Sequence, residues 1–309
     1  MVRLRFVCIF IALATLSPRA KAQAQEADRV SFRLNDKKTL NINIGSKPFA
    51  VYRLNMDGEL PKPFLLPVRA ADGTIVTRPL ENPEDHPHHK GVWVSVDKVN
   101  EVDFWAEKGR IVTKSIDIVH GKAPKFHVVN DWQSLDGKPI VREETWITVF
   151  PNRLMTYDIR FKAAHGPVTF GDTKEGLFGF RMVNSLREKE TGKVVNAEGK
   201  KGTRECWGQQ SKWIDYFGKI ESKTYGVTLM DHPKNFRKSR YHVRNYGLFS
   251  ISPFGDNAYT KGKEEAKPVE LKANNSLQLR YAIYFHDGDT KQGKVEEAYK
   301  LFLKSAATK

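Results

Sequence analysis

Hydrophobic and polar residues alternate with a period of two along most of the chain. The pattern is clearest in seven runs: Val30–Leu34, Leu40–Ile44, Val92–Val96, Phe126–Trp132, Val141–Phe150, Met155–Phe161 and Leu277–Phe285. A period of two is typical of a strand with one buried and one exposed face. Turn residues such as Asp72-Gly73 and Pro151-Asn152 separate neighbouring runs. We therefore expect an all-β protein with antiparallel sheets.

The 3.6-residue period of a helix occurs only near the C-terminus. Val295, Ala298, Tyr299 and Phe302 recur at the spacing i, i+3, i+4 and i+7. This spacing predicts one C-terminal helix over residues 291–304.

The strand candidates exceed what one immunoglobulin-sized sandwich uses, and they do not alternate with helices. No internal repeat and no Pro- or Ser-rich linker divides the chain. We therefore predict one domain over residues 25–309, a large β-sandwich of two broad sheets. Residues 260–276, charged and rich in turn residues, are the best candidate for a long inserted loop.

The N-terminus has the layout of a secretory signal peptide. Arg3 and Arg5 precede an apolar run over residues 6–16, and small residues follow with the A-x-A pattern of a cleavage site. We assign residues 1–24 to a signal peptide and expect a periplasmic or secreted protein. The apolar run is about half of the roughly 20 residues that cross a bilayer. We therefore expect no stable membrane insertion after cleavage; a retained anchor is the alternative.

Composition and charge exclude several classes of protein. Hydrophobic residues make up 40% of the chain and aromatic residues 11%, which excludes a disordered protein. The formal net charge is +15, but the basic residues are spread along the chain and match no nucleic-acid-binding motif, so we expect no nucleic-acid partner. The chain has no motif for a nucleotide cofactor, a serine hydrolase or a helical zinc protease. Cys206 has no histidine nearby in sequence, so nothing marks it as a nucleophile.

The densest group of chemical side chains is the segment Asp85–Gly91, which holds His86, His88 and His89. Imidazole titrates near neutrality and can take or give a proton without a large pKa shift. In an extended segment His86 and His88 face one way and His89 the other. Two histidines on one face could flank a substrate oxygen or hold a divalent metal, whose third ligand the sequence does not place. A solvated loop without function is the alternative.

Two further segments carry candidate groups. Asp172, Lys174 and Glu175 lie between two glycines, where a carboxylate could act as a base and the amine could stabilise an oxyanion. An ordinary β-turn is the alternative. Farther along, His242 and Arg244 share one face of an extended segment and could read an anion or a hydroxyl. A cross-strand salt bridge is the alternative.

The tryptophans offer flat apolar faces for a sugar ring, although most large aromatic residues belong to the core. Trp105 and Trp207 are the best placed for a ligand, since they lie near polar and Gly-rich sequence. We also assign Arg181 to substrate binding.

Several motifs in these segments resemble the PmoA-like (DUF6807) family of secreted bacterial proteins, over roughly residues 45–305. They are Asp85-His86-Pro87-His88-His89-Lys90-Gly91-Val92-Trp93, Val102-Asp103-Phe104-Trp105, Asp172-Thr173-Lys174-Glu175-Gly176, Tyr241-His242-Val243-Arg244-Asn245-Tyr246-Gly247-Leu248-Phe249 and Pro253-Phe254-Gly255. Tyr241 stands where a tryptophan is expected. The resemblance implies the large β-sandwich (supersandwich) of galactose mutarotases and some polysaccharide lyases. It also implies carbohydrate chemistry, with oxidised 3-keto sugars as one substrate class.

The sequence thus predicts a carbohydrate-active isomerase, lyase or hydrolase, with its site in a cleft on the concave face of one sheet. Acid/base catalysis is assigned to His88, His242, Asp172 and Glu175, with histidine as the acid and a carboxylate as the base. Substrate binding is assigned to His86, His89, Lys174, Arg244, Trp105, Trp207 and Arg181. The reaction type stays open among mutarotation, epimerisation, elimination and hydrolysis. A non-catalytic glycan-binding protein is the main alternative, and a metal-dependent oxygenase, which would bind copper or iron, is a further one.

Overall fold

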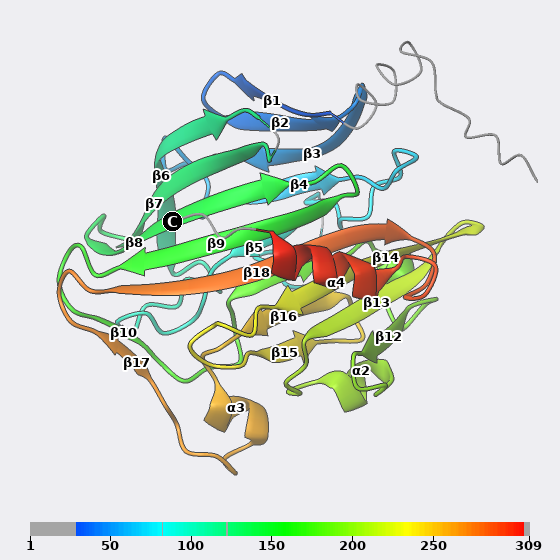
Figure 1. The fold of residues 1–309 in the computed structure, drawn as a ribbon. Coiled ribbons are helices and arrows are strands. Elements are labelled where there is room, and N and C mark those ends of the chain that lie inside the picture. The colour runs from blue at the N-terminus through cyan, green and yellow to red at the C-terminus, as the bar shows by residue number, and fades with distance from the viewer. Residues whose placement is uncertain (1–28, 82, 122, 306–309) are drawn as a thin grey trace, which may run out of the picture.

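A computed structural model describes residues 29–81, 83–121 and 123–305 (Figure 1). The predicted signal peptide, residues 1–24, lies outside the described residues.

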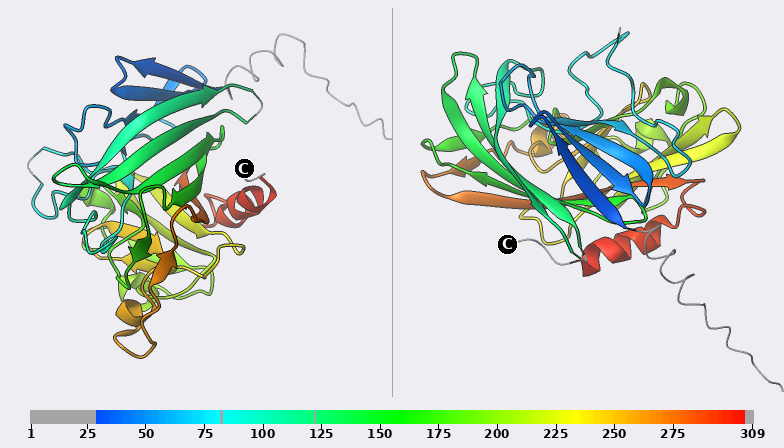
Figure 2. Two further views of the ribbon diagram at one scale, coloured as in Figure 1. Left: turned by 90° about the vertical axis from the view of Figure 1, so that its left-hand side faces the viewer. Right: turned by 90° about the horizontal axis from the view of Figure 1, so that it is seen from above.

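The described chain forms two eight-stranded antiparallel sheets (Figures 1 and 2). The first sheet has the order β1 (Val30–Asn35), β2 (Thr39–Ile44), β3 (Lys47–Arg53), β4 (Phe64–Val68), β5 (Val92–Val94), β11 (Phe178–Arg181), β16 (Leu248–Ser252) and β15 (Arg240–Val243). The second has the order β12 (Lys193–Asn196), β13 (Trp213–Ile220), β14 (Lys223–Asp231), β18 (Ser276–Asp287), β9 (Leu154–Lys162), β8 (Pro139–Val149), β7 (Lys125–Ser134) and β6 (Gly109–Val119). The prediction of an all-β antiparallel sandwich is confirmed.

One hydrophobic core lies between the two sheets. Val92 and Phe178 of the first sheet belong to the same buried cluster as Ile147 and Ile283 of the second. The alternating residues of each strand supply this cluster, because successive side chains of a strand point to opposite faces. The period-two pattern of the sequence is therefore the pattern of burial.

The remaining elements are short. β10 (Val168–Phe170) pairs with β17 (Val269–Leu271), which lies within the predicted loop 260–276. η1 (Asn184–Leu186), α2 (Gly202–Cys206) and α3 (Asp256–Thr260) are helical segments of three to five residues, too short to show a helical period in the sequence.

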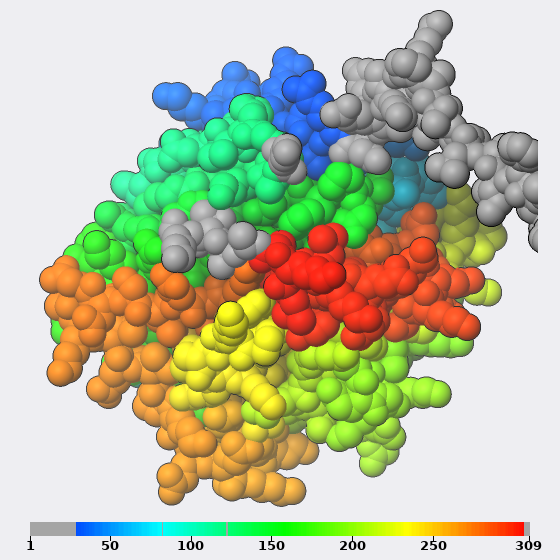
Figure 3. All heavy atoms as spheres, in the orientation of Figure 1, coloured from blue at the N-terminus to red at the C-terminus, as the bar shows by residue number. Residues whose placement is uncertain are grey.

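The predicted C-terminal helix is confirmed as α4 (Val295–Lys304), which begins four residues later than predicted. Lys294 has a left-handed φ of 52°, so the helix cannot extend toward residue 291. The buried face of α4 packs on the outer side of the second sheet, against Leu154, Met230, Ala282 and Tyr284. Figure 3 shows α4, in red, on the surface over these strands. No helix within the described ranges has the length and apolar character needed to cross a membrane.

The outer face of the first sheet carries the features that matter for function. The register aligns Trp93 of β5, Gly179 of β11, Ser250 of β16 and His242 of β15 in one row across four neighbouring strands. The residues on either side of each row member along the chain point into the inter-sheet core, so the row faces away from it. Segments far apart in the sequence therefore meet on one surface.

Candidate functional site

The segment that contains the three histidines is a tight turn, not an extended strand. The His89 amide donates to the His86 carbonyl over 3.0 Å, and His86 has a left-handed φ of 42°. The rings of His86 and His89 stack at 4.7 Å and 6°, and the His88 ring lies 4.5 Å from that of His89. The extended form in which His89 would face away from His86 and His88 is not adopted, because the chain folds back and gathers all three imidazoles.

Two buried arginines hold this turn in place. Arg78 donates to the Asp85 carboxylate over 2.7 Å and to the carbonyls of Asp85, His86 and His89. Arg181, which is 1% exposed, donates to the same Asp85 oxygen over 2.6 Å. Burial opposes ionisation of Asp85, but the Arg181 charge and a hydrogen bond with His86 outweigh it and hold the pKa of Asp85 below its usual range. Arg78 had no signal in the sequence.

The Arg181 guanidinium also fixes the tautomer of His89. Arg181 Nη1 lies 3.2 Å from His89 Nδ1. A guanidinium can only donate, so Nδ1 accepts and the neutral ring carries its proton on Nε2. Burial and the neighbouring imidazole of His88 lower the pKa of His89, so this ring stays uncharged at neutral pH.

A second ion-paired group holds the other side of the turn. The buried Lys62 ammonium donates to the His88 carbonyl over 2.8 Å and lies 3.0 Å from a Glu107 carboxylate oxygen, which also pairs with Lys90. Burial lowers the pKa of Lys62 to about 8, despite the opposing charge of Glu107. Burial, followed by the Lys62 charge, lowers the pKa of His88 to about 4. His88 is therefore neutral at pH 7.

The second imidazole of interest, His242, meets the segment that contains Glu175. Its Nδ1 lies 3.1 Å from the Lys174 carbonyl oxygen and 3.5 Å from Glu175 Oε2. A carbonyl can only accept, so Nδ1 carries the proton and Nε2 keeps its lone pair. His242 is 3% exposed. Burial lowers its pKa to about 4, although the Glu175 charge opposes this shift.

Helix α3 fixes the backbone beneath this pair. The Tyr259 hydroxyl donates to the Lys174 carbonyl over 2.8 Å, so that carbonyl accepts from both Tyr259 and His242. The Lys174 ammonium contacts the Glu175 carboxylate. The predicted base Asp172 instead accepts backbone N–H groups at the start of α3, from Asn257 over 3.1 Å and from Ala258 over 2.9 Å. Both of its oxygens thus hold α3 in place, and Asp172 has a structural role.

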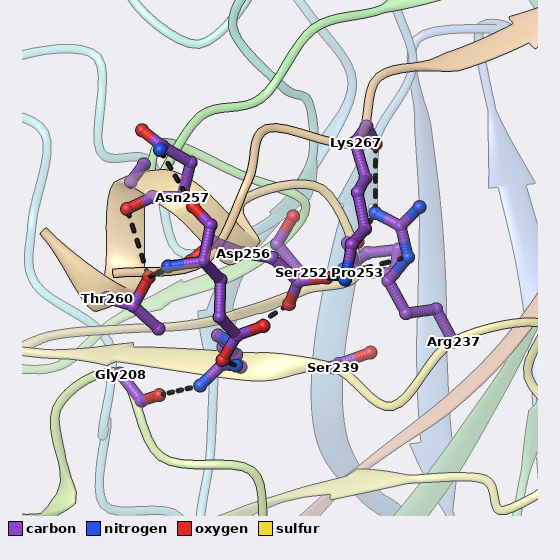
Figure 4. Close-up of polar contacts among 12 residues, drawn as sticks. Gly208, Arg237, Ser239, Ser252, Pro253, Asp256, Asn257, Thr260 and Lys267 are labelled. Carbon is purple, nitrogen blue, oxygen red and sulfur yellow. Dashed lines mark hydrogen bonds and ion pairs between the residues drawn. The ribbon is translucent and has the colours of Figure 1, made fainter. Parts of the chain in front are cut away.

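Figure 4 shows how α3 is attached to the sheet. The buried Asp256 carboxylate lies 3.0 Å from Arg240 Nε and 3.8 Å from Arg237 Nε. Arg240 also donates to the Gly208 carbonyl over 3.0 Å, and Arg237 to the Pro253 carbonyl over 3.1 Å. These contacts join β15 to α3 and to the segment that carries Trp207, so they set the surroundings of His242.

Tyr246 joins the histidine turn to the His242 side. Its ring stacks on His86 at 4.8 Å and 8°. The guanidinium of Arg181 lies 5.0 Å from the Tyr246 ring centre, and that of Arg244 lies 5.6 Å from it. Tyr246 follows His242 by four residues in a motif that alternates His, Arg and Tyr, and this spacing could have marked it as a site residue.

The two predicted aromatic platforms differ in position. Trp105 is 2% exposed and packs beneath the histidine turn, 5.0 Å from Trp93 and 5.5 Å from His89. It is therefore part of an apolar cluster and offers no free face to a ligand. Trp207 is half-buried and lies 6.2 Å from His242, so it stays a candidate for ligand binding.

Buried polar atoms without a hydrogen-bond partner gather around this surface. Within the described part of the chain they include His89 Nε2, Trp93 Nε1, Ser95 Oγ, Arg181 Nε, Trp207 Nε1 and Ser250 Oγ. An unpartnered buried polar group costs roughly 1–3 kcal/mol, so such a group is a marker of a polar binding region. Cavities of about 420, 580 and 750 Å³ lie elsewhere, and no predicted site residue lines them. The predicted cleft is not among these cavities.

No group of three or more His, Cys, Asp or Glu side chains is placed to hold a metal ion in the ranges that the structure describes. The predicted residues that come together are His86, His88, His89, Arg181, Lys174, Glu175, His242, Arg244 and Trp207.

Three solved structures align with this chain at low sequence identity. A β-arabinopyranosidase aligns with a TM-score of 0.36 and 11% identity over 84% of this chain. The GH36 α-galactosidase of Geobacillus stearothermophilus aligns with a TM-score of 0.41 and 11% identity over 86% of this chain. The galactose 1-epimerase of Lactobacillus acidophilus aligns with a TM-score of 0.43 and 7% identity, over 85% of this chain and 100% of the epimerase chain. The chain spans only 39% and 42% of the first two proteins.

A comparison with curated proteins gives no match. The model of a protein family described as "Family of unknown function (DUF6807)" matches residues 39–300. That description does not mention PmoA, so the PmoA-like label stays a prediction. Because the match covers most of the sequence, the chain belongs to the DUF6807 family.

Proposed function

We propose that the protein is a carbohydrate-active enzyme that transfers protons at a sugar. The observation that carries the proposal is the state of His242, a buried neutral imidazole whose Nδ1–H is held by the Lys174 carbonyl beside Glu175. This arrangement leaves Nε2 as a base at neutral pH. The unpartnered polar atoms around it suit a ligand with many hydroxyl groups. The N-terminal sequence pattern supports a location in the periplasm or outside the cell.

The acid in this proposal is not a histidine. His88 and His242 both have a pKa of about 4, so at neutral pH they are unprotonated and cannot act as imidazolium acids. The Tyr259 hydroxyl beside His242 is buried and already donates to the Lys174 carbonyl. Tyr246 is half-buried on the same surface, and burial raises its pKa above the ordinary value. We therefore assign the base to His242 and the acid to Tyr246, which reverses the role that the sequence suggested for histidine.

Mutarotation is the simplest reaction that this pair could perform. His242 Nε2 takes the proton of the anomeric hydroxyl, Tyr246 protonates the ring oxygen, and the bond between the anomeric carbon and the ring oxygen breaks. Rotation and the reverse transfers close the ring with the other configuration. No co-reactant is consumed. Epimerisation and elimination need the same base and acid, with the proton taken from carbon.

The test is turnover by His242→Gln. The purified wild type is incubated with a panel of aldoses, disaccharides and 3-keto sugars, and products are followed by NMR. Loss of the base should reduce kcat roughly 10²–10⁴-fold while the unfolding curve stays close to that of the wild type. His120→Gln, an exposed histidine outside the site, is the matched control and should keep full activity. A variant His242→Gln with wild-type turnover would remove His242 from the mechanism.

Glycan binding without catalysis is the second candidate, and the unpartnered atoms of Ser95, Trp93 and Trp207 favour it. A binding protein would hold one of these sugars with a measurable Kd and release it unchanged. The same incubation separates the two functions, because only the enzyme gives a new signal in the NMR spectrum.

A further inference from the structure

The carboxylates of the site are paired with cations. Glu175 contacts the Lys174 ammonium. Asp85 pairs with both Arg78 and Arg181. Likewise Glu107 pairs with both Lys62 and Lys90. Each of these three carboxylates therefore already has at least one cationic partner.

Arg244 is a cation of this surface that has no carboxylate partner among the described residues. Its side chain is exposed, and within the described ranges it has no carboxylate oxygen within 4.0 Å. Its guanidinium is not loose, since it lies 5.6 Å from the centre of the Tyr246 ring. Arg244 also follows His242 by two residues in the chain, and its charge lowers the pKa of His242.

The surroundings of Arg244 are themselves positive. Arg181, the buried partner of Asp85, lies 5.0 Å from the same Tyr246 ring, so two guanidinium groups approach one aromatic side chain. Tyr246 is in turn stacked on His86, which holds the ring in place. A guanidinium on such a support is already oriented, and its planar pair of N–H donors matches an oxyanion.

We propose that the substrate of this site carries an anionic group, which Arg244 binds beside His242. The inference rests on the proposed function, since it concerns the ligand of the same surface. The shared chemistry is an oxyanion on a sugar. It could come from the carboxylate of a uronate or from a sulfate ester, and the experiment distinguishes the two.

The experiment measures affinity with matched sugars by titration calorimetry. Glucose is compared with glucuronate, and galactose with galacturonate. Glucose is also compared with glucose 6-sulfate, which carries a sulfate ester. Wild-type protein should bind at least one anionic sugar about tenfold or more tightly than its neutral partner, since hydrogen bonds to charged groups contribute roughly 1.5–3 kcal/mol. Preference for the uronates identifies a carboxylate, and preference for glucose 6-sulfate identifies a sulfate; either supports the proposal.

Arg244→Met should abolish the preference for the anionic sugar, and Arg244→Lys should restore part of it. Arg33→Met, which removes an exposed arginine from β1, is the matched control and should keep the preference. Equal affinity for both members of each pair, or a preference that survives Arg244→Met, would overturn the inference. If neutral sugars still turn over in a His242-dependent way, the proposed function stands alone. If no sugar binds or reacts, both proposals fall.

Discussion

His242 is held in one protonation state by contacts to backbone and side chain together. The Lys174 carbonyl fixes its tautomer, and burial keeps the ring neutral. Glu175 opposes the effect of burial, because a negative charge stabilises the imidazolium. The histidine therefore resembles a base whose pKa is set by two opposing influences, of which burial is the larger.

This balance predicts the pH dependence of activity. Activity requires unprotonated His242, so kcat/KM should rise with pH through an acid limb near pH 4, well below the ordinary histidine value of about 6.5. Glu175→Gln removes the charge that raises the pKa of His242. The acid limb should then move to lower pH. The measurement is a kcat/KM profile from pH 3 to pH 8 on any substrate found in the sugar panel.

Glu188→Gln is the control for this experiment, since the Glu188 carboxylate accepts from the Thr203 amide. It should leave the acid limb in place. An acid limb near pH 6.5 in the wild type, or one that moves upward in Glu175→Gln, would contradict the assigned base.

Sequence reasoning found His242, Arg244 and Glu175 because each stands in a short motif. His242 and Arg244 follow the alternation of a strand, and Glu175 lies in a polar segment between glycines. It did not find Arg78 or Lys62, because their partners lie in the turn over residues 85–90, and nothing in their own neighbourhoods distinguishes them from surface cations. Arg78 meets Asp85 through the folding of one loop, and Lys62 meets Glu107 of a later segment. The local pattern does not contain either arrangement.

At the level of elements, the histidine turn is stabilised mainly by a side chain that lies outside it. Within it the backbone makes the bond from the His89 amide to the His86 carbonyl. Arg78 accounts for four further bonds, to three carbonyls and one carboxylate. The residues 85–90 alone favoured an extended segment, since Pro87 disfavours a helical form at His86. The segment is instead a turn because a buried guanidinium supplies the bonds that stabilise it.

Arg78→Lys tests this account. Lysine keeps the positive charge but has no planar fork, so it cannot make the four bonds at once. We expect a loss of about 1–3 kcal/mol in the free energy of unfolding, measured by urea denaturation, and a fall in any His242-dependent turnover. Hydrogen exchange should become faster at the His89 amide.

The control for Arg78→Lys is Arg69→Lys. Arg69 is half-buried, and among the described residues its side chain donates to one carbonyl, that of Gly73, so its replacement should change the stability little. If both variants unfold at the same urea concentration as the wild type, Arg78 does not hold the turn.

For the whole molecule, the sandwich itself is what the period-two pattern predicted. The order of strands within each sheet is not contained in that pattern. β5, β11, β16 and β15 are neighbours although they begin at residues 92, 178, 248 and 240, and their pairing alone sets Trp93 in one row with His242. The residues of the candidate site could therefore be proposed from the sequence. Their meeting on the outer face depends on register, which is fixed by packing of the opposite face.

The second sheet holds a buried ion pair that makes stability depend on pH. His286 Nε2 lies 3.0 Å from Asp215 Oδ1, and the carboxylate also accepts from Thr228 and Thr290. Burial opposes the charged imidazole, but the Asp215 charge outweighs it and raises the pKa of His286. A raised folded-state pKa contributes stability that is fully present below the unfolded value of about 6.5 and is lost as pH rises through the folded value.

We therefore expect His286→Gln to be less stable than the wild type by about 1–3 kcal/mol at pH 6, with the difference shrinking toward pH 9. Urea unfolding of both proteins at pH 6, 7.5 and 9 measures it. The lowered pKa values of His88 and His242 affect stability below about pH 6.5. They do so equally in both proteins, so their effect at pH 6 cancels in the difference. A difference that stays constant from pH 6 to pH 9 would mean that His286 is neutral in the folded protein. The pair would then stabilise the sheet as an ordinary hydrogen bond.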